Sequence, residues 1–248
     1  MAPMAAAAAV AGPCPECGVE NAADHNYCKH CGTPLRSVDV ERELGTGFAE
    51  RTRDRCLQLL KADPENASTH YNLGLAYYHL GQIGNAIRGF ARAIELDDAY
   101  PGAHFQLAVC HYRRGAMSEC AAAARRAIEL NPASAPARYR LAMALFHLGR
   151  LDEAAVAFEQ TLGADAEYVI ACYQLGVIRE RLNDFEGAIK CFERVVDANP
   201  RDASAHYHLG VNYKRQGLDA LAMSALAEAL KLDPADTASA EELQDLQR

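Results

Sequence analysis

Residues 71–97 read YNLGLAYYHLGQIGNAIRGFARAIELD, and the order of small and large residues in this stretch recurs along the chain at a fixed interval. When the sequence is divided every 34 residues from Ala67, five blocks follow one another without an insertion: 67–100, 101–134, 135–168, 169–202 and 203–236. A fixed period of this length indicates a stack of similar helical units, because each unit buries its apolar face against its neighbour.

Each block places small and large residues where two packed helices need them. If repeat positions are counted from 1 at the start of each block, position 7 is always Leu, and positions 8 and 20 hold only Gly, Ala or Cys. Small residues at these positions let two helices approach closely, and a large residue at position 24 in four of the blocks fills the space beside them. Position 15 accepts the left-handed backbone that ends a helix, and it is Gly81, Gly115, Gly149, Asn183 and Gly217. The blocks therefore predict antiparallel pairs, with a first helix over positions 1–14 and a second over positions 17–30.

This pattern resembles the tetratricopeptide repeat (TPR), and the resemblance covers residues 67–236 in register. It implies an all-α fold: helix pairs stacked into a right-handed superhelix, with the first helix of each pair lining the concave face. The consensus Trp at position 4 is missing, and the chain has His70, His104, Arg138, Cys172 and His206 there.

Two flanking segments extend the array. Residues 48–66 match the second half of a repeat, with Cys56 at the large-residue position, and predict a helix that packs on the first full repeat. Residues 237–248 follow an Asp N-cap and carry a short apolar stripe, which predicts a C-terminal capping helix. Residues 1–12 are expected to form a disordered Ala-rich tail, and residues 35–47 a linker.

The first helices offer a candidate peptide groove. Position 5 is aromatic and position 9 is aliphatic or Met in all five blocks, and the resemblance implies that these positions face the groove. The same residues would also serve to pack adjacent first helices together, and the sequence leaves this alternative open. The candidate groove residues are Tyr71, Leu75, Phe105, Val109, Tyr112, Arg113, Tyr139, Arg140, Met143, Tyr173, Val177, Arg181, Tyr207, Val211 and Lys214.

Charge is distributed unevenly between the two sets of helices. The five first helices carry eight Lys and Arg, seven of the nine histidines and a single acid, Glu180, whereas the second helices carry eleven acids and seven bases. This bias predicts an electropositive groove that attracts a partner segment with aromatic or aliphatic anchors and acidic residues. Histidines in the groove would tighten such binding at lower pH, whereas histidines in the core would not. The family's carboxylate clamp is not carried over, because it wants Lys and Asn where this chain has Tyr71 and Leu75.

A different motif lies near the N-terminus, CPECGVENAADHNYCKHCG at residues 14–32. Two CxxC pairs, each followed by Gly, predict two knuckles that hold one metal through Cys14, Cys17, Cys28 and Cys31. Residues 13–34 resemble a short zinc ribbon, which implies one structural Zn²⁺ with no open coordination position. An iron site of the rubredoxin kind is the alternative, and His25 and His30 are candidate substitute ligands.

Composition limits the function. The net charge of −8 makes the chain a poor general binder of nucleic acid or anionic membrane. We find no Gly-rich phosphate loop, HExxH motif or nucleophile elbow, which argues against an enzyme with a small-molecule substrate. The nine cysteines do not form a disulfide framework, which favours the cytoplasm. The sequence therefore predicts a non-enzymatic protein–protein interaction scaffold. Its alternatives are a nucleic-acid-associated zinc-ribbon protein and an iron-dependent redox module.

Overall fold

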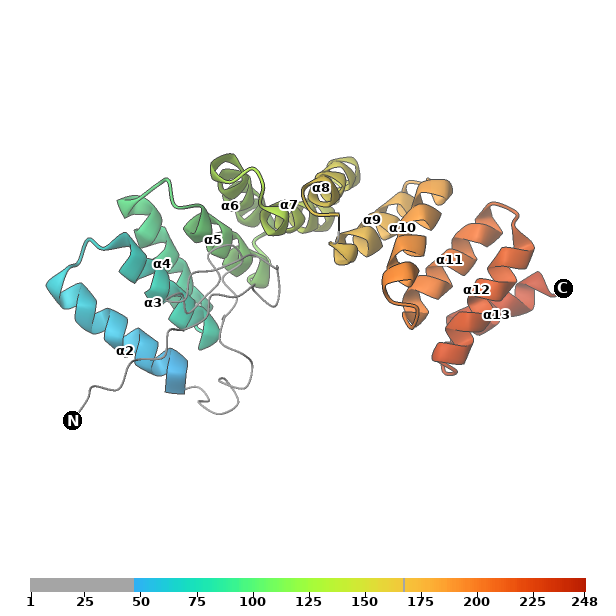
Figure 1. Cartoon of the computed structure of the whole chain (residues 1–248), viewed down its shortest axis with the longest axis horizontal. Coiled ribbons are helices and arrows are strands. Elements are labelled where there is room, and N and C mark those ends of the chain that lie inside the picture. The colour runs from blue at the N-terminus through green and yellow to red at the C-terminus, as the bar shows by residue number, and fades with distance from the viewer. Residues whose placement is uncertain (1–46, 167) are drawn as a thin grey trace, which may run out of the picture. The chain divides into compact units, whose positions relative to one another are not determined.

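The computed structural model describes residues 47–166 and 168–248, and within these residues it contains twelve α-helices and no strand (Figure 1). The four clustered cysteines, His25, His30 and the predicted tail, ribbon and most of the linker lie outside the described residues. By internal contacts the chain divides into two units, Met1–Arg140 and Leu141–Arg248, and the boundary falls inside α7.

The helices follow the predicted period. The first helices are α3 (Ala67–His79), α5 (Pro101–Arg113), α7 (Ala135–His147), α9 (Val169–Arg181) and α11 (Ala203–Arg215). The second helices are α4 (Ile83–Leu96), α6 (Met117–Leu130), α8 (Leu151–Ala164), α10 (Phe185–Ala198) and α12 (Asp219–Leu232). Each first helix and each second helix thus begins 34 residues after the previous one of its kind, as the sequence predicted.

The turn inside each helix pair has the backbone that position 15 required. The four glycines there have φ between +72° and +75°, and Asn183 has φ of +61°. Asn183 is the only described non-glycine residue with positive φ. The prediction of a left-handed residue at position 15 is confirmed in all five repeats.

Side-chain caps fix where several helices begin. Asn66, Asp184 and Asp202 each accept a hydrogen bond from the backbone N–H three residues later, at 2.9 to 3.0 Å, at the starts of α3, α10 and α11. Each cap satisfies one of the N–H groups that a helix leaves unpaired at its start.

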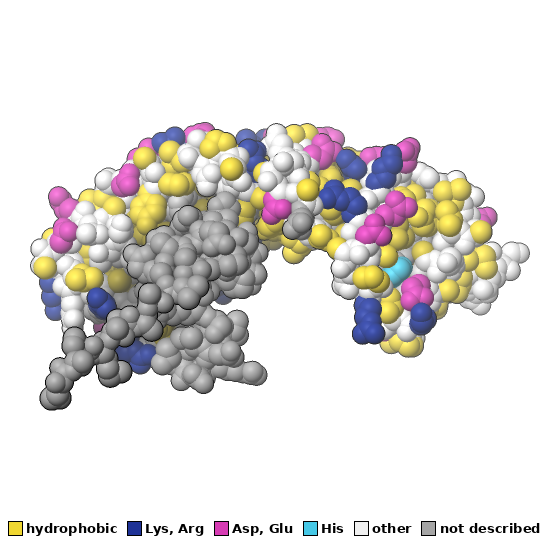
Figure 2. All heavy atoms as spheres, viewed as in Figure 1, with side chains coloured by type: hydrophobic (Ala, Val, Ile, Leu, Met, Phe, Trp, Pro, Cys, Tyr) yellow, Lys and Arg dark blue, Asp and Glu magenta, His cyan; other side chains and the backbone are white. Residues whose placement is uncertain are grey.

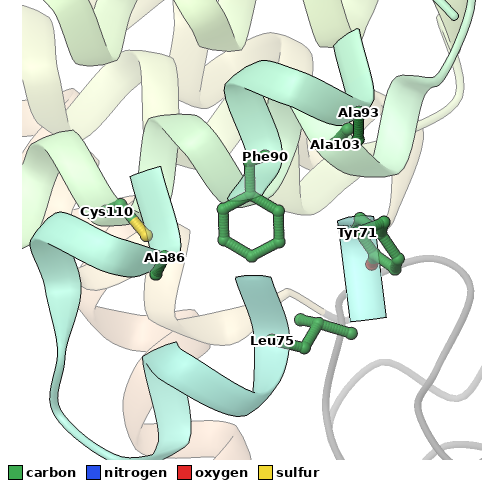
Figure 3. Packing of buried hydrophobic residues seen from close by; sticks show 7 residues of the cluster. All are labelled: Tyr71, Leu75, Ala86, Phe90, Ala93, Ala103 and Cys110. Carbon is green, nitrogen blue, oxygen red and sulfur yellow. The ribbon is translucent and has the colours of Figure 1, made fainter. Parts of the chain in front are cut away.

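In three repeats, a large side chain at position 24 of the second helix packs against a glycine at position 8 of the first helix. In the first repeat, a Cβ on Gly74 would lie 2.7 Å from Cε1 of Phe90, so the ring occupies the space that a side chain at position 8 would need. Figure 3 shows Phe90 at the centre of its cluster, between Ala86, Tyr71 and Leu75. The same relationship joins Gly176 to Phe192 and Gly210 to Leu226 in the second unit. The predicted pairing of positions 8 and 24 is confirmed in these repeats.

The flanking segments are helical. α2 (Gly47–Ala62) packs on α3, and Cys56 on α2 is buried. α13 (Thr237–Leu246) packs on α12, and Asp236 caps it by accepting from the N–H groups of Ala238 and Ser239. A helix with a polar outer face at this position shields the apolar side of the last full repeat from water.

Position 4, which lacks the consensus Trp, makes a recurrent hydrogen bond instead. Nε2 of His70, His104 and His206 lies 2.9 to 3.1 Å from the carbonyl oxygen six residues earlier, and Nη2 of Arg138 lies 2.6 Å from the equivalent oxygen. Cys172 cannot reach that carbonyl, and Arg194 of α10 donates to the oxygen of Ala166 at 2.8 Å. In each repeat, one side chain therefore satisfies the carbonyl of the loop that precedes the first helix.

Candidate functional site

The candidate groove residues of the first two repeats are mostly core residues. Tyr71, Leu75, Phe105 and Val109 are between 1 % and 9 % exposed. The Tyr71 ring lies 4.8 Å from that of Tyr100 and 5.6 Å from that of Phe90, centroid to centroid. The sequence left open whether these four residues line a groove or pack adjacent helices together, and the structure shows that they pack.

The equivalent residues of the later repeats keep part of their surface open. Tyr139, Met143, Tyr173, Val177, Tyr207 and Val211 are all half-buried. The Tyr173 ring meets Phe192 and His208 edge-on, at centroid distances of 5.7 Å. These residues combine a packing contact with an accessible apolar surface on the first helices, as a recognition surface requires.

Cation–π contacts connect neighbouring first helices. The guanidinium carbon of Arg113 on α5 lies 4.9 Å above the ring of Tyr78 on α3. The guanidinium carbon of Arg140 on α7 lies 4.7 Å above the ring of Tyr112 on α5. In the second unit, Arg181 on α9 lies 4.9 Å above Phe146 on α7. We call these three pairs the guanidinium stacks, and in each of them the ring stands at repeat position 12.

In the last two repeats, the residue at position 12 forms ion pairs instead. Nδ1 of His208 lies 2.9 Å from Oε2 of Glu180, which stands at position 12 of its repeat. Nζ of Lys214, at position 12 of the last repeat, donates to Glu242 at 2.7 Å and to Asp245 at 2.6 Å, both on α13. Position 12 thus joins neighbouring first helices by a cation–π contact in three cases and by charge pairing in one, and in the last repeat it joins α11 to the capping helix α13 by charge pairing.

The predicted excess of positive charge on the first helices is partly neutralised within the chain. Lys214 has its two carboxylates, and Arg179 pairs with Glu159 at 2.7 Å. Arg113, Arg140 and Arg181 have no ion pair among the described residues. Figure 2 shows basic and acidic side chains interspersed on the visible face of the described part, so positive charge does not form one continuous field on that face.

Most of the histidines that sequence analysis placed on the first helices have structural contacts. His70, His104 and His206 hold loop carbonyls, and His208 stacks on Phe192 with ring centroids 4.7 Å apart and planes 5° from parallel. Burial lowers the pKa of His111, against an opposing effect from Glu119. These contacts favour the core explanation for the histidines over the groove explanation.

The first unit also has a shallow cavity of about 250 Å³ between α3 and α4, lined by His70, Leu73, Tyr77, Asn85, Arg88, Gly89 and Arg92. It opens beside Gly89, where a Cβ would lie 2.8 Å from the Cα of Gly74. The cavity therefore results from the close approach of the two helices. It is small beside the pockets that enclose drug-sized ligands.

The cysteines of the helices are free and buried. Burial raises the pKa of Cys110 to about 12, and those of Cys120 and Cys191 to about 11. Thiols with such pKa values are protonated at neutral pH and behave as small apolar core residues. Among residues 47–166 and 168–248, no group of three or more His, Cys, Asp or Glu is arranged to hold a metal ion.

The predicted groove residues include Tyr112, Arg113, Arg140 and Arg181, but not Tyr78 and Phe146, the rings beneath two of the arginines. A signal for these rings was present, because position 12 is aromatic in each of the first three repeats. Each of these repeats is followed by one with Arg at position 6 or position 13. This pairing across a repeat boundary becomes visible only when the blocks are compared in sequence order.

The fold and these contacts define a protein built of helical repeats, with side-chain contacts between neighbouring first helices in each unit. The chain belongs to the tetratricopeptide repeat family: the family model matches residues 46–104 and 173–237, which together make up half of the chain. A model for subunit 3 of the anaphase-promoting complex, or cyclosome, matches residues 81–161. No curated protein matches the chain.

Several solved structures share the fold. YrrB, described as a TPR protein with an unusual peptide-binding site, is 17% identical with a TM-score of 0.70, and the match covers 76% of this chain and 97% of YrrB. MamA from Desulfovibrio magneticus RS-1 is 19% identical with a TM-score of 0.63, covering 69% and 97%. PilF of Pseudomonas aeruginosa is 15% identical with a TM-score of 0.66, covering 83% and 92%. At these identities the likeness establishes the fold alone. None of the described helices is both long and apolar enough to cross a membrane.

Proposed function

We propose that the protein is a non-enzymatic interaction scaffold whose first helices bind a segment of a partner protein. The segment would insert aromatic or aliphatic anchors and would carry acidic residues. The observation that carries this proposal is the row of half-buried apolar residues at position 9, namely Met143, Val177 and Val211. Membership of a family built for protein interaction and the likeness to YrrB support it.

The proposal includes a second module near the N-terminus. Cys14, Cys17, Cys28 and Cys31 would hold one structural Zn²⁺, and residues 13–34 would add a second contact surface. The support is the spacing of the two CxxC pairs, which suits a closed tetrahedral site of four thiolates. The free thiols of the five helical cysteines fit a reducing compartment, and we place the protein in the cytoplasm.

A peptide selection tests the scaffold. The immobilised full-length chain is exposed to a library of displayed random dodecapeptides, and enriched peptides are synthesised and titrated against the protein. Replacing Val177 and Val211 together by Gln removes two half-buried apolar surfaces from the first helices, and we expect affinity to fall about tenfold.

The matched control replaces Val156 and Leu221 by Gln. These residues are 51% and 50% exposed on the second helices α8 and α12, so the control removes similar apolar surface from outside the proposed site. We expect the control to bind as the unmodified chain does. Selection of no peptide, or an equal loss of affinity in both variants, would contradict the proposal.

A further inference from the structure

Two guanidinium stacks lie next to each other in the first unit. Arg113 of α5 covers the ring of Tyr78, and the neighbouring Tyr112 of α5 is covered by Arg140 of α7. Tyr78 also packs against the buried cluster that contains Phe105 and Val109 of α5. Positions 5 and 9 of α5 are core in this unit, and the half-buried Tyr78 with the exposed Arg113 above it extends that packing to the surface of the first helices.

A stacked guanidinium keeps its hydrogen-bonding edge available. The planar group contacts the ring through its face, while its N–H donors point outward in the plane in a fork that matches a carboxylate. Stacking on a ring also fixes the orientation of a side chain that would otherwise rotate freely, so less conformational entropy is lost when an anion binds.

The donors of these two arginines are not used within the described part of the chain. Neither Arg113 nor Arg140 has a hydrogen bond or ion pair to a described residue, and Nε of Arg140 is buried without a partner. Elsewhere the chain supplies anions for comparable cations, since Lys214 has two carboxylates and Arg179 has Glu159. The two stacks therefore present positive charge that the described chain leaves uncompensated.

The two stacks also suggest a distance between the two guanidinium groups. Both rings stand at position 12 of consecutive first helices and each has its guanidinium carbon 4.7 to 4.9 Å from its centre, so we expect the two groups to lie about one helix–helix distance apart, roughly 8–10 Å. A peptide in the polyproline II conformation rises about 3.1 Å per residue and makes one turn every three residues, so side chains at i and i+3 share a face. Two carboxylates three residues apart on such a peptide would therefore span this distance from one side.

We propose that Arg113 and Arg140 are the carboxylate receptors of the first unit, and that they select a partner segment with two acidic residues at positions i and i+3. This inference rests on the proposed function and adds its chemical selectivity. Each guanidinium binds one carboxylate through paired N–H donors, and Tyr78 and Tyr112 hold the two groups in place. Apolar anchors between or beside the acids would lie on the first helices.

The test uses the full-length chain and the displayed random dodecapeptides, with three double variants. Replacing Arg113 and Arg140 by Gln removes both charges, and replacing both by Lys keeps the charges but loses the planar fork. The matched control replaces Arg88 and Arg92 by Gln, which removes two charges from α4 in the same unit. Thermal unfolding of each variant verifies that it is folded.

We expect selected peptides to be enriched in Asp or Glu pairs at i and i+3. The affinity of a synthetic i, i+3 peptide should fall about tenfold in the Gln variant and recover only partly in the Lys variant. The control should stay within about twofold, and a peptide with the acids moved to adjacent positions should bind less tightly than the i, i+3 peptide.

Different failures separate the two proposals. Selected peptides without acidic residues, or equal affinities for the Gln variant and the control, would overturn the role of the two arginines and leave the scaffold intact. Selection of no peptide would overturn both. Equal binding of the two spacings would overturn the i, i+3 rule.

Discussion

The ring of Phe90 lies against the bare Cα of Gly74, and a Cβ on that glycine would come within 2.7 Å of Cε1 and 2.8 Å of Cδ1 of the ring. Phe90 is fully buried, so the ring has little room to move away. The contact fixes how closely α3 and α4 approach, and through them the position of every side chain on that first helix.

We therefore expect Gly74→Ala to lower the free energy of unfolding by about 1–3 kcal/mol, because the added methyl overpacks the core. Gly84→Ala on the adjacent helix α4 is the matched control, since nothing lies within 4 Å of a Cβ there. Removal of a helical glycine should raise stability by about 0.5–1 kcal/mol. Urea unfolding followed by circular dichroism measures both values, and two changes of the same sign would contradict the packing argument.

The loop carbonyl before α9 provides a second prediction. Arg194 donates to the oxygen of Ala166, where the other repeats use the residue at position 4. Arg194→Met should destabilise the second unit by about 0.5–1.5 kcal/mol, the typical net worth of one hydrogen bond. Chemical unfolding of the single variant measures this loss.

The loss of stability caused by Arg194→Met should largely disappear in a variant that supplies another hydrogen-bond donor to the carbonyl of Ala166. Cys172→His combined with Cys191→Ala reproduces the His206 and Ala225 pair of the fifth repeat, and its imidazole can donate to Ala166. In a double-mutant cycle, we expect Arg194→Met to cost little in that background. An undiminished cost would show that Arg194 acts through something other than this carbonyl.

Features that depend on spacing within one repeat were predictable from the sequence. The helix starts, the left-handed Asn183 and the fit of Phe90 against Gly74 each follow from residues of a single helix pair, and the structure confirms them. Their causes are local: a backbone that excludes most side chains, or two helices joined by a short turn.

Features that depend on contacts between repeats were not predicted. The stacking of Arg140 on Tyr112 joins residues on different first helices, and the repeat pattern predicted both as groove residues without pairing them. Leu75 and Val177 hold the same repeat position, yet one is buried and the other is partly open, because their neighbours differ. A periodic pattern assigns both to one face of the helix, and only the packing of the neighbouring helices determines how much of each remains accessible.

A third prediction concerns acid. The hydrogen bond from Lys214 lowers the pKa of Asp245, and the hydroxyl of Ser239 lowers that of Asp236, so both carboxylates stabilise α13 only while ionised. A carboxyl with a lowered folded pKa contributes stability above its unfolded pKa of about 3.9, and this stability is lost as pH falls through the folded pKa. Because both carboxylates are solvent-accessible and their contribution is small, we expect α13 to pack less firmly on its neighbours below about pH 4 while α11 and α12 stay folded. Backbone NMR shifts during an acid titration measure this.

A pair of variants on α13 isolates the contribution of Lys214. Asp245→Asn removes one charge pair and should make the α13 signals less dependent on pH. Glu241→Gln removes an exposed carboxylate without an ion pair among the described residues, and it should leave the acid transition unchanged. Equal effects of the two substitutions would show that net charge, rather than the pairing with Lys214, controls the acid transition.

The last prediction concerns thiol chemistry. Because burial keeps Cys110, Cys120 and Cys191 protonated, the helical cysteines should react slowly with an aromatic disulfide reagent at pH 8. If Cys14, Cys17, Cys28 and Cys31 hold zinc, their thiolates should also be protected until a chelator removes the metal. We then expect a burst of four rapid equivalents after chelation and an unchanged helical circular dichroism signal, because the repeats bury their own core. Elemental analysis of the untreated protein should find one zinc per chain.

A variant with Cys14→Ser and Cys17→Ser separates metal protection from simple burial. It should contain no zinc and should show two rapid equivalents without any chelator, from Cys28 and Cys31. A coloured protein that contains iron would replace the zinc assignment with the redox alternative. Four rapid thiols before chelation would remove the metal site altogether, and a collapse of helical signal on chelation would show that the repeats depend on the cysteine cluster for their own stability.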